Sequence, residues 1–271
     1  MNTEKKITRV ASDKNTSGAA YTPTMKDKQQ AGNFRVLGVA LWVLAFVVQI
    51  VGIWFLFAYA PLEASQQITL IAILVVDLVL LLVGSSFWKK ANRFDPPSRA
   101  SSLFVLQSQL GVVMAFVCFL PVLVVAIIKK EFIVAVVAAV ALLGGSLGSA
   151  DYHPASQEQY AEQATEVETL TGKDFVYWTK SGNRFHLYSD CRYINTSNTS
   201  EIFEGSVADA RHMKNITSLC STCKGKVMKE KGITEEQLQQ AAEAAKEAPQ
   251  GAGQPEQATE AAAEETQETT E

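Results

Sequence analysis

Four long apolar runs dominate the first half of the chain and alternate with short polar segments. Residues 36–60, 68–88, 103–128 and 132–148 are almost free of charge, whereas both ends of the chain are rich in Lys, Glu, Gln, Thr and Ala. At 1.5 Å per helical residue, about 20 residues cross the roughly 30 Å of bilayer hydrocarbon. The pattern predicts a four-helix transmembrane domain, and its last run lies near the lower length limit of about 17 residues.

Basic residues flank these runs unevenly and predict an orientation. The arm 1–35 and the loop 89–102 are rich in Lys and Arg, whereas the loop 61–67 has neither. By the positive-inside rule, the amino terminus is cytoplasmic, and four spans return the rest of the chain to that side. Lys129 and Lys130 lie on the opposite side in this scheme, which leaves open a three-span topology with an external carboxyl-terminal part.

Two polar side chains interrupt the apolar runs near mid-bilayer. Gln49 in the first run and Asp77 in the second each lie about 13 Å from the outer end of their helix. In an antiparallel hairpin, a protonated Asp77 and Gln49 could form an interhelical hydrogen bond worth on the order of 1 kcal/mol. The alternative is a proton or cation relay, which would require more than one buried acid, and the other runs contain none.

A histidine and three cysteines occur at metal-ligand spacing beyond the apolar half. His186 and Cys191 lie in "RFHLYSDC", and Cys220 and Cys223 form the Cys-x-x-Cys pair of "SLCSTC". Aromatic and β-branched runs on both sides of "KSGN" predict a β-hairpin that carries His186 on its second strand. This ligand set suits tetrahedral Zn²⁺, and four protein ligands leave no open position for water, so a structural site is predicted.

Two alternatives to this ligand set remain open. His212, on a short helix that Ser206 and Asp209 are predicted to cap, could replace His186. A redox Cys-x-x-Cys without metal would instead need a thioredoxin-like pattern of strands and helices, which the sequence lacks. The odd number of cysteines in this part favours the cytosol over an external disulfide framework, while Cys118 in the third run is typical of a small packing residue.

The segments "VYWTKSGNRFHLYSDCRYI" and "EGSVADARHMKNITSLCSTC" resemble the small zinc-binding module at the ends of various bacterial nucleases and metallo-β-lactamase-fold proteins. They are also distantly similar to the metal-binding domain of the Ada DNA-repair protein. The matching positions are Val176, Tyr177, Thr179, Gly182, His186, Cys191, Ala210, Cys220 and Cys223. Phe185 stands where Tyr is usual, and the insert after Cys191 is longer. The resemblance covers about sixty residues and implies a folded zinc module, in some relatives close to DNA.

Composition divides the remaining chain into segments of different character. We interpret 149–172 as a linker with a short helical piece, 173–231 as the zinc-binding module, 232–248 as a marginal helix and 249–271 as an acidic disordered tail. The arm 1–35 is also expected to lack regular structure. The net charge of -4 sums these unlike parts and therefore says little about partners.

Together the patterns predict an α-helical membrane protein with four transmembrane helices and a small α+β zinc-binding module. We expect it in the bacterial cytoplasmic (inner) membrane with both termini cytoplasmic, Zn²⁺ as cofactor and a binding or regulatory role. Its partners would be the lipid bilayer and an unknown protein or nucleic acid. One alternative is a small transporter or channel that uses Asp77, for which a homo-oligomer would be needed to enclose a path. Another is a membrane-associated DNA-handling protein; an enzyme is less favoured, because no catalytic acid or base cluster is recognisable.

Overall fold

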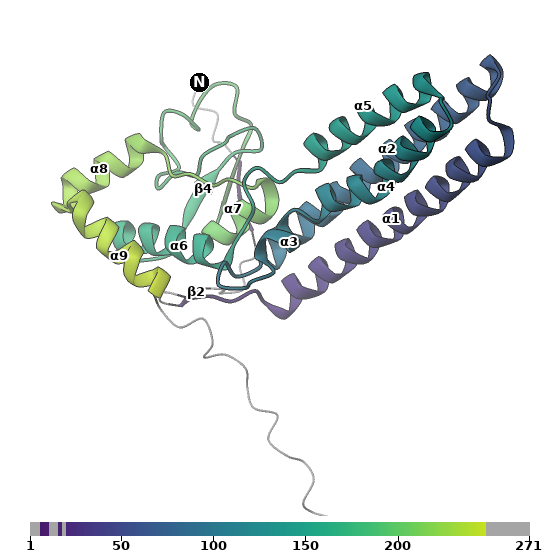
Figure 1. The fold of residues 1–271 in the computed structure, drawn as a ribbon. Coiled ribbons are helices and arrows are strands. Elements are labelled where there is room, and N and C mark those ends of the chain that lie inside the picture. Colours follow the sequence, from purple (N-terminus) through teal and green to yellow (C-terminus); the bar gives the residue numbers. More distant parts are fainter. Residues whose placement is uncertain (1–5, 11–15, 18–19, 248–271) are drawn as a thin grey trace, which may run out of the picture.

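The computed structural model describes residues 6–10, 16–17 and 20–247, which form a bundle of long helices with a mixed α/β module at one end (Figure 1). The bundle helices are α1 (Met25–Tyr59), α2 (Ala64–Phe94), α4 (Leu110–Ile128) and α5 (Phe132–Ser149), and the short α3 (Phe104–Ser108) precedes α4. The four bundle helices are long and apolar enough to cross a membrane. The prediction of four long apolar helices is therefore confirmed.

Polar side chains set two of the helix boundaries that differ from the apolar runs. α1 begins well before its apolar run, because Thr24 and Asp27 form a reciprocal capping box. The third run is broken at Gln109, which separates α3 from α4. The side-chain amide of Gln109 donates to the carbonyl of Asp151 at 2.8 Å and accepts from its backbone N–H at 3.2 Å, so this break anchors the chain that leaves α5.

Helices α1 and α2 pack closely because small residues face each other. A Cβ atom at Gly84 would lie 2.8 Å from the Trp42 ring and 3.1 Å from the carbonyl oxygen of Gly38. The Trp42 indole donates to the carbonyl of Leu81 at 3.4 Å. Glycine thus lets the backbones approach and leaves room for one aromatic ring between them, as is common where helices associate in lipid.

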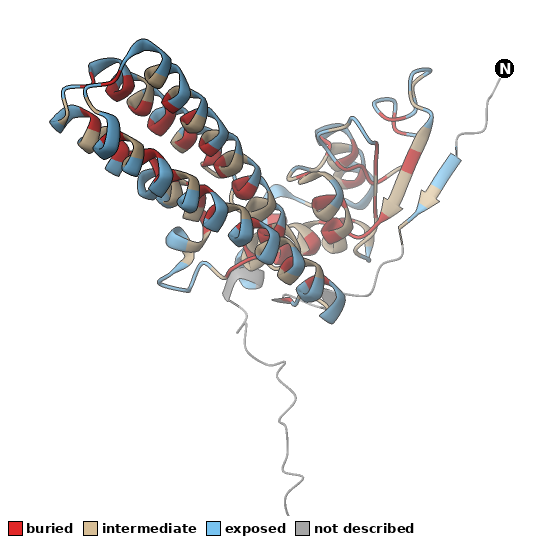
Figure 2. Cartoon of the chain, turned by 90° about the vertical axis from the view of Figure 1, so that its right-hand side faces the viewer, coloured by how far each residue is buried: buried red, intermediate tan, exposed pale blue. Residues whose placement is uncertain are grey.

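Residues along the outer faces of the bundle are exposed (Figure 2), and many of them are large apolar side chains. Val47 on α1, Val79 on α2 and Leu143 on α5 are each at least half exposed. A helical bundle in water would turn such side chains inward, whereas lipid accepts them on the outer face. The surface therefore agrees with the membrane prediction drawn from hydropathy.

The module combines segments from both ends of the described chain. Its elements are β1 (Lys6–Arg9), β2 (Thr16–Ser17), β3 (Ala20–Tyr21), α6 (Gln157–Thr171), β4 (Val176–Trp178), β5 (Glu201–Gly205), α7 (Val207–Lys214), α8 (Ser221–Lys231) and α9 (Glu235–Glu247). The central strand β5 pairs with β1 in parallel and with β4 in antiparallel orientation. The expectation that the amino-terminal arm lacks regular structure is wrong for its described residues, because β1 finds a partner strand near the other end of the chain.

The module extends beyond the predicted residues 173–231 on both sides. The expected linker contains the full helix α6, which ends at Gly172 in a left-handed conformation with φ of +86°. The expected marginal helix is α9, which begins with reciprocal hydrogen bonds between Thr234 and Gln237 and buries Leu238 in the module core. The predicted acidic tail, 249–271, lies outside the described residues.

Specific polar contacts join the module to the bundle. The Tyr160 hydroxyl on α6 donates to the carbonyl of Arg93 at 2.6 Å. In the loop after α2, Ser98 donates to the Glu158 carboxylate of α6, also at 2.6 Å. Arg35 of α1 pairs with Asp95 at 2.7 Å and holds the start of that loop. The end of α2 is therefore the main attachment of the module.

We predict that Gly84→Val destabilises the bundle, since the new side chain would collide with Trp42 and the Gly38 carbonyl. Overpacking of this kind costs about 1–3 kcal/mol, so the thermal midpoint in detergent should fall. Gly144→Val is the matched control, because a Cβ atom at Gly144 meets nothing within 4 Å. Tryptophan fluorescence during heating measures both variants. Equal midpoints for the two would contradict the close packing of α1 against α2.

Candidate metal centre

A short antiparallel bridge positions His186. Its backbone N–H donates to the carbonyl of Tyr177 at 2.7 Å, and the Tyr177 N–H donates to the His186 carbonyl at 2.8 Å. The intervening turn is closed by Thr179, which accepts from the N–H of Gly182 through both its carbonyl and its hydroxyl. The predicted hairpin is thus present, although its second strand is reduced to this single bridge.

A second bridge brings the Cys-x-x-Cys pair to the histidine. The N–H of Phe185 donates to the carbonyl of Ser218 at 3.1 Å, and the N–H of Cys220 donates to the Phe185 carbonyl at 2.9 Å. Phe185 thereby runs parallel to Leu219. Because successive side chains alternate along extended backbone, this register places His186 beside Cys220 while the Phe185 ring enters the module core.

The cysteines lie at a helix start and in a tight turn. Cys220 is the N-cap of α8 and Cys223 lies in its first turn, so one helical turn presents both sulfur atoms on the same side. Cys191 lies in a turn in which its carbonyl accepts from the N–H groups of Ile194 and Asn195. Three separate backbone segments therefore contribute ligands.

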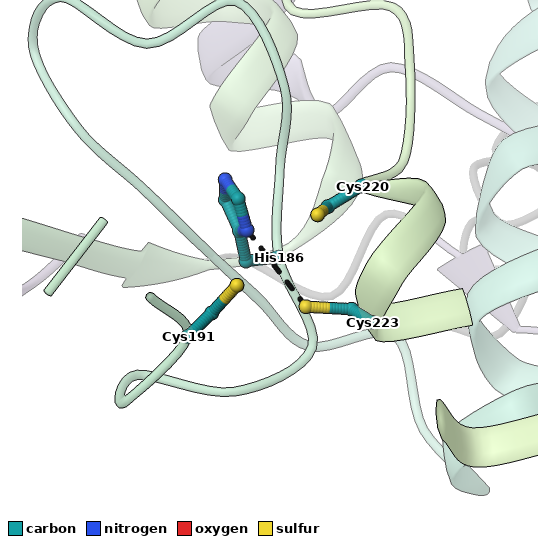
Figure 3. A group of neighbouring side chains, drawn as sticks. All are labelled: His186, Cys191, Cys220 and Cys223. Carbon is teal, nitrogen blue, oxygen red and sulfur yellow. Dashed lines mark hydrogen bonds between the residues drawn. The ribbon is translucent and has the colours of Figure 1, made fainter. Parts of the chain in front are cut away.

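The four predicted ligands converge in a buried site (Figure 3). One ligand atom from each of His186, Cys191, Cys220 and Cys223 lies within 4.8 Å of all the others. A tetrahedral zinc site with 2.0–2.3 Å bonds has ligand-to-ligand distances of about 3.3–3.8 Å. Nδ1 of His186 already lies 3.8 Å from Sγ of Cys223. All four residues are buried among the apolar side chains of the module, so the donor set and its spacing fit a closed metal site.

A metal ion binds a neutral imidazole and deprotonated thiols, and the surroundings of His186 and Cys220 favour these protonation states. Burial, helped by the charge of Arg184, lowers the pKa of His186 to about 4, so its imidazole is neutral near pH 7. Burial alone would raise the pKa of Cys220, but hydrogen bonds from the backbone N–H groups of Cys223 and Thr222 bring it below its ordinary value. These N–H groups belong to the start of α8, where the helix dipole also favours a thiolate.

His212, the alternative ligand, lies elsewhere. Its Nδ1 is 3.6 Å from the Asp27 carboxylate, and its Nε2 is 3.3 Å from the Tyr21 hydroxyl. The imidazole also packs against Phe94 with ring centroids 4.7 Å apart. His212 therefore belongs to the junction between module and bundle. The sequence pattern did not indicate this cluster, although the predicted Ser206–Asp209 capping box of its helix is present.

The two polar residues of the apolar runs, Gln49 and Asp77, lie on the buried faces of α1 and α2 but do not pair directly. Gln49 is 2% and Asp77 0% exposed. Within the described chain, neither carboxylate oxygen of Asp77 and neither amide atom of Gln49 has a hydrogen-bond partner. This structure therefore shows no hydrogen bond between the two side chains.

Comparisons with known protein families, with curated proteins and with solved structures found no match to this chain.

We predict that His212 makes the attachment of the module sensitive to acid. Burial lowers the pKa of His212 below its ordinary 6.5. The negative charges of Asp27 and Asp209 raise this pKa but do not cancel the effect of burial. The unfolded chain therefore binds this proton more readily than the folded chain, and stability is lost as the pH falls below 6.5. His212→Phe keeps a ring beside Phe94 but cannot titrate.

The measurement is the thermal midpoint of both proteins at several pH values between about 7.5 and 5.5. The wild-type protein should lose more stability over this range than His212→Phe. The metal ligands are the same in both chains, so their titration cancels in the comparison. Parallel curves for the two proteins would contradict the assignment.

Proposed function

We propose that this chain is a multi-pass membrane protein that holds a structural Zn²⁺ through His186, Cys191, Cys220 and Cys223, in a module at the cytoplasmic face of a bacterial inner membrane. The module would serve as an anchored binding or regulatory unit. The observation that carries the proposal is the convergence of one nitrogen and three sulfur ligands in a buried site.

The donor set favours zinc among the biological metals. Three thiolates and one imidazole in a tetrahedral arrangement are typical of structural Zn²⁺ sites, whereas hard cations prefer oxygen ligands. With four protein ligands, a bound ion would have no open position for water or substrate. Its role would then be to fix the loop around Cys191 and the start of α8 to the bridge at His186, which supports a binding module over a hydrolase.

The distribution of charge supports a cytoplasmic module. The basic residues at the module end of the bundle are Lys26, Lys28, Arg35, Lys89, Lys90, Arg93 and Arg99. At the opposite end, Lys129 lies 4.7 Å above the Phe57 ring, and its neighbour Lys130 shares the turn between α4 and α5. The positive-inside rule then favours the module end as cytoplasmic. Pairing of β1 with β5 also argues against the three-span alternative, which would separate these strands across the membrane.

The surface of α8 favours a partner in the aqueous phase over lipid. Lys226, Lys229 and Lys231 are exposed on this helix, and Lys226 lies 4.4 Å above the Tyr188 ring. Figure 1 shows α8 at the end of the module away from the bundle, so its lysines do not adjoin the apolar faces of the long helices. A soluble partner with an acidic surface, a protein or a nucleic acid, suits this position best.

The metal is tested on the full-length chain, because β1, α6 and α9 contribute to the module. Native mass spectrometry of the detergent-solubilised protein should find one Zn²⁺ per chain. His186→Ala should lose most of it by removing a ligand, whereas His212→Ala, an equally drastic change at a buried histidine of the same module, should retain it. Absence of zinc in the folded wild-type protein, or equal loss in both variants, would refute the site.

The orientation is tested with two single cysteines at exposed serines. Ser65 lies in the first turn of α2 at the far end of the bundle, and Ser102 lies between α2 and α3 at the module end. A membrane-impermeant maleimide should label Ser65→Cys in intact bacteria and Ser102→Cys only after permeabilisation. The four native cysteines are buried and give little background. The reverse pattern would place the module outside the cell.

A further inference from the structure

Two side chains near the middle of the bundle, Asp77 and Gln49, lack hydrogen-bond partners in the part of the chain that the structure describes. Neither carboxyl oxygen of Asp77 and neither side-chain amide atom of Gln49 has one. The contrast with Glu131 is informative, because this other buried acid of the bundle accepts from the Leu62 N–H at 2.7 Å and from the Gln67 amide at 3.4 Å. Asp77 has no such donor, and a bare carboxylate at this depth is strongly disfavoured.

The two unpartnered side chains lie at similar heights along the packed helices α1 and α2. On one side of them, Trp42 donates to the carbonyl of Leu81. On the other side, a Cβ atom at Gly52 would meet Leu70 at 3.6 Å. Counting between these two contacts at 1.5 Å per residue gives Gln49 and Asp77 an offset of about one helical turn along the bundle axis, near the middle of their helices.

The chemistry of the pair identifies the ligand class. A carboxylate and an amide together offer three oxygen atoms, fewer than the roughly six that hard metal cations collect. A protonated carboxyl is different, because it gains a donor and keeps an acceptor, which complements the acceptor and donors of an amide. A rotamer change of either side chain would let the neutral acid and the Gln49 amide satisfy each other, whereas an ionised Asp77 would leave the amide oxygen without a donor.

We propose that Asp77 and Gln49 form an intramembrane binding site for a single proton, independent of the zinc module. Asp77 carries the proton near neutral pH, and Gln49 is the positioning residue that stabilises the neutral acid. The site binds a proton and does not relay it along a chain of acids, because Asp77 is the only acidic residue within the four predicted spans.

The test uses dicyclohexylcarbodiimide, an apolar reagent that reacts with protonated carboxyl groups in an apolar environment. The acid proton and the carboxylate add across a C=N bond of the reagent, and rearrangement leaves a stable N-acylurea with no atom lost. Peptide mapping of the folded, full-length protein near neutral pH should locate the adduct on Asp77, and labelling should decline as the pH rises. Asp77→Asn should lose the adduct, and Gln49→Leu should reduce it.

Glu131 is the internal control, since it is buried in the same bundle but accepts hydrogen bonds and should remain unlabelled. Unlabelled Asp77 in wild-type protein that unfolds cooperatively on heating would overturn the proposal. So would labelling of Asp77 that sodium chloride suppresses and choline chloride at the same ionic strength does not, because that result indicates a cation site. Since these readings come from the wild-type chain, they stand even where Asp77→Asn fails to fold.

Discussion

An even number of antiparallel helices returns the chain to the end of the bundle where it entered, and the module depends on this return. β1 precedes the bundle and β5 follows it, yet they pair in register from Lys6 with Glu201 to Arg9 with Glu204. The strand that supports one edge of the sheet therefore reaches its place only because four helices lie between it and its partner. The same return places Tyr21 and Asp27 beside His212. Bundle and module are consequently one structure, in which the helices set the position of the module's first strand.

Within the module, a metal would act on segments that backbone pairing has already brought together. The bridges at Tyr177 and Phe185 use only main-chain groups and fix the approach of His186 to Cys220. The core around Trp178 and Phe185 buries apolar surface without any ion. The segment with the least regular structure is the loop around Cys191, and it also supplies a ligand. Zinc would therefore contribute most by restraining this loop, since loop closure is entropically unfavourable without a crosslink.

The sequence predicted those features whose physical signal is local. The length of the apolar runs predicted the four long helices, and the spacing of one histidine and three cysteines predicted the site at His186. The pair Ser206 and Asp209 predicted the start of α7. It did not predict β1, because "KITR" has no distinctive pattern and forms a strand only against a segment almost two hundred residues away. Nor did it indicate the junction around His212, whose partners come from separate elements. A direct hydrogen bond between Gln49 and Asp77 was predicted, but neither side chain has a partner in the described chain, because composition does not encode side-chain conformations within a helix contact.

Helix α2 connects the region around Asp77 with the junction between bundle and module. Asp77 lies in its middle, and its last turn enters the junction, where Phe94 packs against His212 and the carbonyl of Arg93 accepts from Tyr160. The Gly84 contact with α1 lies between Asp77 and this junction. Close packing there holds the last turn of α2, and with it the attachment of the module, at a fixed place on α1.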